Sequence, residues 1–223
     1  AVTESILEPC LWLRGILPSH YTHIPHTAHP THELKVISTL PAAVMFTSGT
    51  FYGDASGGPW TKYPTLRRVG CGLCQTSAEK TLVWGQSFNL PGIVQTVPRG
   101  ELFVLQYLLE QATHHAKIIF VTDSLLNAKL FWQGQAKACA SANCDLFKLI
   151  FQDIKLKSLQ VSVRWMPSHT KDETKERPAD VTDIDVAGND FADVLAGEAA
   201  QRHIIDVNVS TQVLYHTFRV NKF

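Results

Sequence analysis

Residues 44–58 read VMFTSGTFYGDASGG, and this stretch decides the fold. Apolar and β-branched residues lead up to one carboxylate, Asp54, and small residues follow it, which is the pattern of a strand that ends in a turn. A lone carboxylate is costly to bury in a sheet, so two interpretations stay open: a turn residue at the strand end, or a ligand for a cation. For Asp54 taken alone, the turn is the simpler explanation.

The composition indicates one α/β domain with extensions. The 223 residues are 45% hydrophobic and 18% charged, which is enough apolar material for a sizeable core. Lys and Arg total 20 and balance 20 Asp and Glu, so a nucleic-acid partner would have to be held by a local patch and by metal ions. No transmembrane or secretory pattern is present, so we expect an intracellular protein, in the nucleus or cytoplasm, without a membrane partner. The cysteines lack the spacing of a disulfide scaffold, and we expect free thiols.

The chain divides into a leader, a core domain and a tail. The leader, residues 1–43, carries prolines and histidines spaced by three; a Pro-rich linker is the simple interpretation, and a metal-binding tract is the alternative. The core domain spans 44–202, and residues 203–223 form a C-terminal extension. After the first strand, periodicity predicts strands at about 69–77, 81–90, 117–124 and 160–166, and helices at about 101–112, 125–137, 143–157 and 189–202.

Three further acids stand at the ends of predicted elements. Glu101 lies on the inward face of the first helix, Asp123 ends an apolar run typical of a buried parallel strand, and Asp193 lies beside small residues of the last helix. Taken alone, Glu101 would complement the helix dipole and Asp123 would cap the next helix. Ligand sites in α/β sheets form at the carboxyl ends of strands, so Asp54 and Asp123 would emerge side by side there if the first and fourth strands are adjacent and parallel.

Acids gathered at one place have a chemical requirement of their own. Four carboxylates would repel one another and raise one another's pKa unless divalent cations neutralise them. Oxygen ligands favour Mg²⁺ or Mn²⁺ over zinc. Two such ions, roughly 4 Å apart, are a known arrangement for phosphoryl transfer.

Five short motifs carry a resemblance to a known family. They are YGDASG at 52–57, PRGEL at 98–102, VTDS at 121–124, WMPSH at 165–169 and GNDFADVLA at 188–196. In this order the core resembles the ribonuclease H family, type 1-like. The segments CLWLRG at 10–15 and LRRVGC at 66–71 make it most similar to the RNase H domain of non-LTR retrotransposon-type polyproteins. The resemblance implies an α/β fold with a mixed five-stranded sheet, order 3-2-1-4-5, flanked by helices.

The resemblance also implies a function for the core domain. It is that of an endonuclease which hydrolyses the RNA strand of RNA–DNA hybrids with two Mg²⁺ ions, with Mn²⁺ as a substitute. Asp54 would contact both ions, and Glu101 and Asp123 would hold one of them. Asp193 would help to hold the other. His169 would assist proton transfer or product release.

The substrate contacts depart from the family pattern. Asn or Gln often precedes the helix glutamate in this family, whereas this chain has VPR at 97–99. Contacts to nucleic acid are predicted instead at Ser56, Arg99, Ser124 and Asn127. Because a basic, Trp-rich substrate handle is also missing, we expect weak unaided affinity and reliance on a tethered reverse transcriptase or a larger complex.

Two other functions stay open on the same fold. One is a nuclease or strand transferase that acts on DNA, and the other is a non-catalytic module that contacts RNA or protein. The helix glutamate and the WMPSH motif argue against the first, and the presence of all four acids argues against the second. A comparison of hybrid and duplex DNA as substrates separates a DNA-acting enzyme from one that acts on hybrids.

Overall fold

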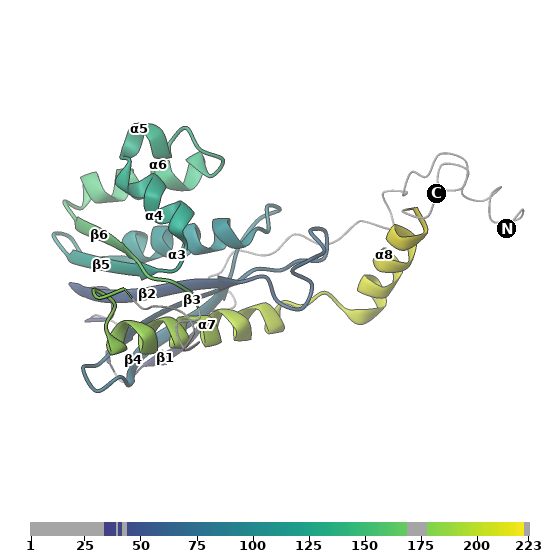
Figure 1. Cartoon of the computed structure of the whole chain (residues 1–223), viewed down its shortest axis with the longest axis horizontal. Helices are drawn as coiled ribbons and strands as arrows, with labels where there is room; N and C mark the ends of the chain where they lie inside the picture. Colours follow the sequence, from purple (N-terminus) through teal and green to yellow (C-terminus); the bar gives the residue numbers. More distant parts are fainter. Residues whose placement is uncertain (1–33, 39, 42–43, 169–177, 221–223) are drawn as a thin grey trace, which may run out of the picture.

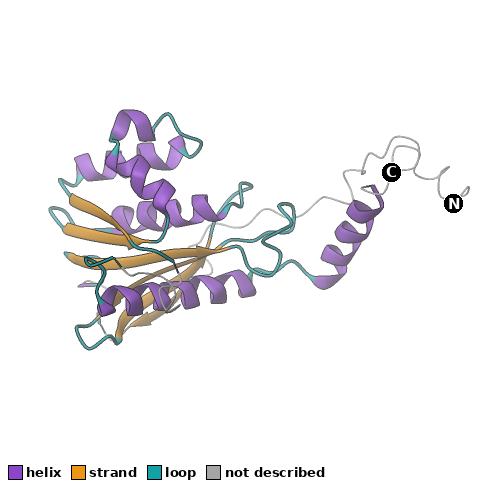
Figure 2. Ribbon diagram, viewed as in Figure 1, coloured by secondary structure: helices purple, strands orange, loops and turns teal. Residues whose placement is uncertain are grey.

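A computed structural model describes residues 34–38, 40–41, 44–168 and 178–220. One mixed sheet forms the centre, with α3, α4, α5 and α6 on one face and α7 on the other (Figure 1, Figure 2). In chain order the elements are β1 (Lys35–Ser38), β2 (Gly49–Ser56), β3 (Gly70–Thr76), β4 (Leu82–Asn89), α3 (Val97–Gln111), β5 (Lys117–Thr122), α4 (Leu125–Trp132), α5 (Gln135–Ala138), α6 (Cys144–Leu156), β6 (Gln160–Trp165), α7 (Asp183–Arg202) and α8 (Val207–Val220).

The sheet has six strands in the order β1-β4-β3-β2-β5-β6. Strands β2, β3 and β4 form an antiparallel meander, and β5 and β6 run parallel to β2. Without β1, the order is the predicted 3-2-1-4-5, so the predicted mixed α/β fold is confirmed. The observed sheet has one strand more than the five predicted. The additional strand lies in the stretch predicted as leader. It consists of four exposed residues, KVIS. Their sequence does not alternate between apolar and polar residues, which is the pattern that identifies a half-buried strand.

The two faces of the sheet bury different cores. On β2, Phe51 belongs to the large cluster that includes α3, whereas Tyr52 belongs to a smaller cluster that includes α7. The largest fully buried side chains are Trp84, Phe51, Phe88, Phe120 and Phe147. The division follows from the alternation of side chains along a strand, so residues two apart on β2 share a face.

Helix α7 lies unusually close to β3. A Cβ added to Gly72 would stand 2.1 Å from the carbonyl oxygen of Ala192, and one added to Gly70 would stand 2.2 Å from that of Ala196. Glycine at these two positions lets the helix backbone rest directly on the strand. The small residues around Asp193 predicted such a close helix contact, and Ala196 is part of it.

Several helix boundaries differ from the predicted ones. Helix α3 begins at Val97 rather than at 101, with a proline in its first positions, and α7 begins at Asp183 rather than at 189, behind a capping box formed by Thr182 and Asp185. The helix predicted at 125–137 is divided into α4 and α5 at Gly134, whose φ is 85°.

The tail forms a helix, α8, that stands beyond the end of the sheet (Figure 1). The rings of Tyr63, in the β2–β3 loop, and Phe218 pack edge to face at 6.3 Å. Cys71, Cys74, Cys139 and Cys144 are free thiols, as predicted. Within 34–38, 40–41, 44–168 and 178–220, no helix combines the length and apolar character of a membrane span.

Candidate active site

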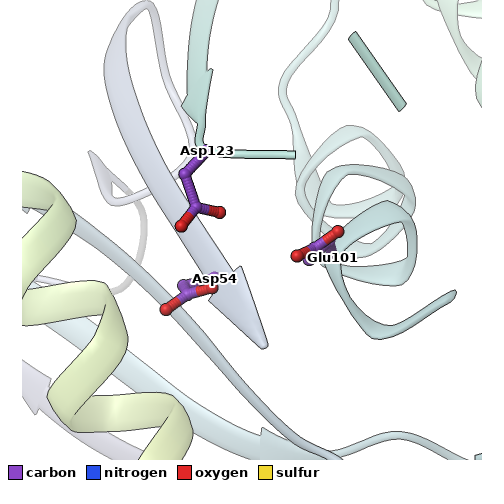
Figure 3. Close-up of side chains that lie close together, drawn as sticks. All are labelled: Asp54, Glu101 and Asp123. Carbon is purple, nitrogen blue, oxygen red and sulfur yellow. The ribbon is translucent and has the colours of Figure 1, made fainter. Parts of the chain in front are cut away.

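Three carboxylates converge where β2 and β5 end. These strands are parallel neighbours in which Tyr52 pairs with Val121, so Asp54 and Asp123 follow at the same height. Glu101 reaches the same point from α3. One carboxylate oxygen from each of the three acids lies within 4.8 Å of the other two, and Figure 3 shows the three side chains gathered around one space. The structure therefore brings together three of the four acids that the sequence predicted to meet.

The ordinary explanations of Asp54 and Glu101 do not hold in the structure. Asp54 lies within β2, opposite Gly72 of β3, and is only 8% exposed, so it is not a turn residue. Glu101 lies beyond the first turn of α3, which contains no acid, so it does not serve the helix dipole there. Neither carboxylate is placed where local structure alone would require one.

Asp193 faces the same space from α7. It lines a cavity of about 230 Å³, and its charge contributes to the raised pKa of Asp54. The group of three within 4.8 Å does not include it. The cavity is lined by Asp54, Ala55, Val97, Glu101, Asp123, Ser168, Asn189, Asp190 and Asp193. Asp193 therefore forms the α7 wall of the cavity rather than its centre.

Burial and mutual repulsion raise the pKa of two of these carboxyls. The pKa of Asp54 rises to about 8, first because burial disfavours its charge and then because Asp123 is close; the N–H of Ala55, which donates to Asp54 Oδ1 at 2.7 Å, offsets only part of this. The pKa of Glu101 rises to about 7, chiefly through burial and also through Asp123, against a hydrogen bond with Ser124. Without added positive charge the cluster holds protons near neutral pH, and a divalent cation bound by these oxygens would release them.

This electrostatic arrangement predicts how stability changes with pH. The native state keeps protons on Asp54 and Glu101 that the unfolded chain, with ordinary carboxyl pKa values near 4, has already released. Native stability should therefore fall as pH rises from about 4 to about 8. In a chelator, Asp54→Asn should therefore become more stable relative to the wild type as pH rises across this window. The difference between their free energies of unfolding should grow by an amount on the order of a few kcal/mol. Urea titrations at pH 5, 6, 7, 8 and 9 measure it.

A second aspartate provides the control for that titration. Arg99 holds the pKa of Asp145 below its usual range, chiefly through a hydrogen bond, so Asp145 is ionised in both states above pH 5. The difference between Asp145→Asn and the wild type should therefore stay flat over the same range. A flat profile for Asp54→Asn as well would mean that Asp54 is ionised without a cation.

Two of the predicted nucleic-acid contacts support the cluster from inside the protein. Asn127 Nδ2 donates to the carbonyl oxygen of Pro98 at 2.8 Å and to Glu101 Oε2 at 3.3 Å. Ser124 also hydrogen-bonds with Glu101. Trp165 Nε1 donates to the carbonyl oxygen of Asp123 at 3.0 Å. In the structure, Asn127 and Ser124 orient an acid of the cluster.

The other two predicted contacts are also engaged within the chain. Both terminal nitrogens of Arg99 bind the carboxylate of Asp145, and the shorter distance is 2.5 Å. Ser56 ends β2, and its hydroxyl accepts a hydrogen bond from the N–H of Gly58 at 3.3 Å. A substrate contact by Arg99 would therefore have to compete with a bidentate ion pair.

One predicted site residue has no described position, and two polar cavity residues on α7 were not predicted. His169 lies outside the described residues, although Ser168 before it lines the cavity. Asn189 and Asp190 were quoted in a motif but given no role. They lie one helical turn before Asp193 on α7, and the predicted helix at 189–202 already contained that spacing, so the signal was present in the sequence.

The sequence matches no family model and no curated protein. Among solved structures, it is similar to prototype foamy virus protease-reverse transcriptase (a CSH mutant), with 18% identity and a TM-score of 0.52 over 82% of this chain and 24% of that one. It also matches RNase H1 of the archaeon Halobacterium salinarum, with 19% identity and a TM-score of 0.44 over 69% of this chain and 97% of that one. The RNase H domain of prototype foamy virus matches with 16% identity and a TM-score of 0.47, over 70% and 95%.

These similarities concern the fold. The chain spans about a quarter of the length of the foamy virus protease-reverse transcriptase. A TM-score of 0.52 at 18% identity indicates a shared fold and leaves activity to the site itself. The chain has a ribonuclease H-like fold with an additional edge strand.

Proposed function

We propose that this chain is a metal-dependent endonuclease that hydrolyses the RNA strand of RNA–DNA hybrids. The observation that carries the proposal is the convergence of Asp54, Glu101 and Asp123 within 4.8 Å, at the end of two parallel strands of a ribonuclease H-like sheet. Asp193 lines the same cavity from a fourth element. These acids belong to the sequence motifs that resemble the ribonuclease H family.

The donor set fits divalent magnesium. Every candidate ligand in the cluster is a carboxylate oxygen, which suits Mg²⁺ or Mn²⁺. Burial, followed by neighbouring carboxylates, raises the pKa of Asp54 and Glu101, and a bound cation would offset both effects. Asp54, Glu101 and Asp123 would hold one ion, and Asp54 with Asp193 would hold a second. When bound, two such ions activate a water molecule and stabilise the leaving oxygen of the phosphodiester.

The protein's own groups hold the acids ready for this chemistry. Asn127 and Ser124 fix the Glu101 carboxylate, and the N–H of Ala55 fixes that of Asp54. These contacts reduce the reorganisation needed when substrate arrives, because the ligands already point to one space. We propose that His169 assists proton transfer from the adjoining loop.

The substrate partner is expected to be held by more than this chain. The formal charge is balanced, and the Arg99 guanidinium is engaged by Asp145, so Arg99 can bind a phosphate only by giving up that ion pair. We infer that the domain works while tethered to a reverse transcriptase within a retroelement polyprotein. A short tether would supply an effective concentration in the millimolar range, which compensates for weak intrinsic affinity.

A substrate comparison tests this function. Equal concentrations of a labelled RNA–DNA hybrid, single-stranded RNA and duplex DNA are incubated with the protein and Mg²⁺, and each is repeated with a chelator. We expect cleavage of the RNA strand of the hybrid alone, at least about a hundredfold faster than the others, because discrimination depends on contacts that only the hybrid offers. Cleavage should stop in the chelator.

Each of the other possible results contradicts a different part of the proposal. Equal cleavage of duplex DNA would identify a DNA-acting nuclease on the same fold. Bound Mn²⁺ without cleavage of any substrate would identify a non-catalytic module. Cleavage that persists in the chelator would remove the metal ions from the proposal.

A further inference from the structure

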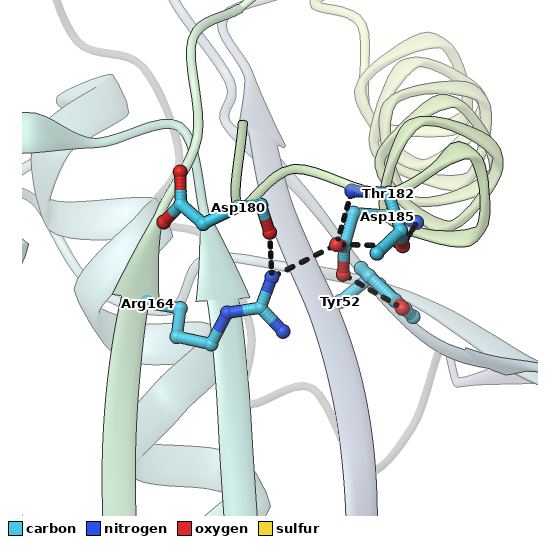
Figure 4. A network of polar contacts seen from close by, with 5 residues as sticks. All are labelled: Tyr52, Arg164, Asp180, Thr182 and Asp185. Carbon is cyan, nitrogen blue, oxygen red and sulfur yellow. Dashed lines mark hydrogen bonds and ion pairs between the residues drawn. The ribbon is translucent and has the colours of Figure 1, made fainter. Parts of the chain in front are cut away.

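A buried carboxylate joins helix α7 to two strands of the sheet (Figure 4). The side chain of Asp185 is 3% exposed. Its Oδ2 accepts hydrogen bonds from the N–H and the hydroxyl of Thr182, at 2.9 and 2.8 Å, and pairs with Arg164 at 2.8 Å. Its Oδ1 accepts a hydrogen bond from the Tyr52 hydroxyl at 3.2 Å. We call Tyr52, Arg164, Thr182 and Asp185 the Asp185 network.

Only part of this network is needed to begin the helix. The hydrogen bond from the Thr182 N–H belongs to the capping box, together with the bond that the Asp185 N–H donates to Thr182 Oγ1 at 3.2 Å. This box satisfies the first backbone groups of α7 without any residue from outside. Tyr52 and Arg164 come from β2 and β6 and serve no such purpose. Their contacts with Asp185 require another explanation.

Tyr52 and Arg164 stand in one row across the sheet. Tyr52 pairs with Val121 on β5, and Val121 pairs with Arg164 on β6, so the two side chains leave the same face, the one that α7 covers. Arg164 also donates to the carbonyl oxygen of Asp180 at 3.2 Å. One carboxylate at the start of α7 is therefore bound to two strands that are separated by a third.

The contacts of Asp185 are strong and directional. Burial by itself would raise the pKa of Asp185, but hydrogen bonds from Thr182 and Arg164 outweigh it and hold the pKa below its usual range. Burial, followed by the nearby Asp185, raises the pKa of Tyr52 to about 12, so its hydroxyl remains a donor. Charge-assisted hydrogen bonds of this kind fix position more firmly than neutral ones.

The remainder of the α7 interface combines close backbone contact with one other polar anchor. A Cβ on Gly188 would stand 2.4 Å from the ring of Tyr52, and the helix backbone rests directly on Gly70 and Gly72 of β3. Contacts between such small residues determine how close the helix lies to the sheet. At the far end of α7, Arg202 Nη2 donates to the carbonyl oxygen and the hydroxyl of Ser87 on β4, at 3.0 and 2.9 Å. The Asp185 network is the anchor at the start of the helix, and its strand partners lie on β2 and β6.

The network shares both of its elements with the cavity. Tyr52 precedes Asp54 by two residues on the same face of β2, and Asp185 precedes Asp193 on α7. We propose that Tyr52, Arg164 and Asp185 are positioning residues that fix α7 along β2 and thereby set the height of Asp193 relative to Asp54. This inference rests on the proposed function, because it assigns a consequence to the distance between two metal-binding carboxylates.

Three variants test the positioning role. Arg164→Met removes the guanidinium and keeps an apolar stem, and Tyr52→Phe removes only the hydroxyl. Lys80→Met is the matched control, because Lys80 pairs with Asp183 at 2.9 Å at the same end of α7, with both side chains at least half exposed. Mn²⁺ affinity is measured by calorimetry without substrate. The Mg²⁺ concentration for half-maximal cleavage and the KM for hybrid are measured separately.

The expected result is a loss of metal affinity without a loss of substrate affinity. In Arg164→Met the Kd for Mn²⁺ should rise about tenfold, with a parallel rise in the Mg²⁺ requirement and an unchanged KM for hybrid. Tyr52→Phe should raise the Kd about threefold, and Lys80→Met should leave it unchanged. An unchanged Kd in folded Arg164→Met overturns the proposal. If that variant does not fold, an unchanged Kd in Tyr52→Phe overturns it.

A measurement without metal separates this inference from the proposed function. If the wild type neither binds Mn²⁺ nor cleaves hybrid, the proposed function fails. The positioning role is then judged from the backbone amide resonances of Asn189 and Asp193 in the metal-free protein. Shifts in Arg164→Met and Tyr52→Phe, with none in Lys80→Met, would support it; resonances that coincide with those of the wild type would overturn it.

Discussion

Replacing Asp54 by asparagine is expected to lower the rate of hybrid cleavage by at least about a thousandfold. The negative charges of Asp123, Asp193 and Glu101 all contribute to the raised pKa of Asp54, which places it at the electrostatic centre of the cavity. The asparagine side chain has nearly the same shape as that of aspartate, but it has no negative charge with which to hold a cation between the other acids. Single-turnover cleavage of a labelled hybrid at saturating Mg²⁺ measures the loss.

The same substitution should stabilise the metal-free protein. Asp54 is costly to ionise in its buried position, so an uncharged isostere should raise the free energy of unfolding at pH 8 in a chelator. Loss of activity together with a gain in stability cannot be attributed to misfolding. If Asp54→Asn still cleaves hybrid at the wild-type rate, Asp54 has no part in the site, and the proposed function loses its central residue.

Replacing Gly72 by alanine is expected to cause a large loss of stability. The added Cβ would stand 2.1 Å from the carbonyl oxygen of Ala192 and 2.8 Å from the nitrogen of Ala196, and both are backbone atoms that cannot rotate away. Helix α7 would have to move off β3, which we expect to cost about 3 kcal/mol or more. Urea denaturation monitored by circular dichroism measures it.

The matched control is a glycine on the helix itself. Nothing lies within 4 Å of the position that a Cβ on Gly197 would take, and Gly197 lies inside α7. Gly197→Ala should therefore stabilise the protein by up to about 1 kcal/mol, because alanine favours the helix. The changes in the free energy of unfolding caused by Gly72→Ala and Gly197→Ala are thus expected to have opposite signs. A small effect at Gly72 would show that the helix and the strand are not in direct contact.

Much of the fold follows from local patterns in the sequence. The run at residues 44–58 and the continuous apolar run at 117–124 correctly indicated two strands that each deliver an acid to their ends. Their parallel pairing, which places Asp54 beside Asp123, was implied by the family resemblance and is confirmed. The capping box and the proline-led helix start were also present in the sequence, but they were not used to place the starts of α7 and α3.

The features that escaped prediction depend on contacts between distant segments. Strand β1 has no alternating pattern, and its identity comes from pairing with β4, as between Lys35 and Ser87. Asn127 and Ser124 were predicted to contact nucleic acid because they are polar and near an acid, and nothing in their spacing indicated that Glu101 would bind them first. The Asp185 network likewise joins residues more than a hundred positions apart.

The edge position of β1 has a practical consequence for any shortened version of the protein. A version that starts at residue 44 would remove β1 and bare the backbone N–H and C=O groups of β4 that now pair from Ser87 to Trp84. An uncovered strand of this kind readily adds a strand from another molecule. Fibres or precipitates obtained from such a fragment would therefore reflect the missing strand rather than a flaw in the core domain.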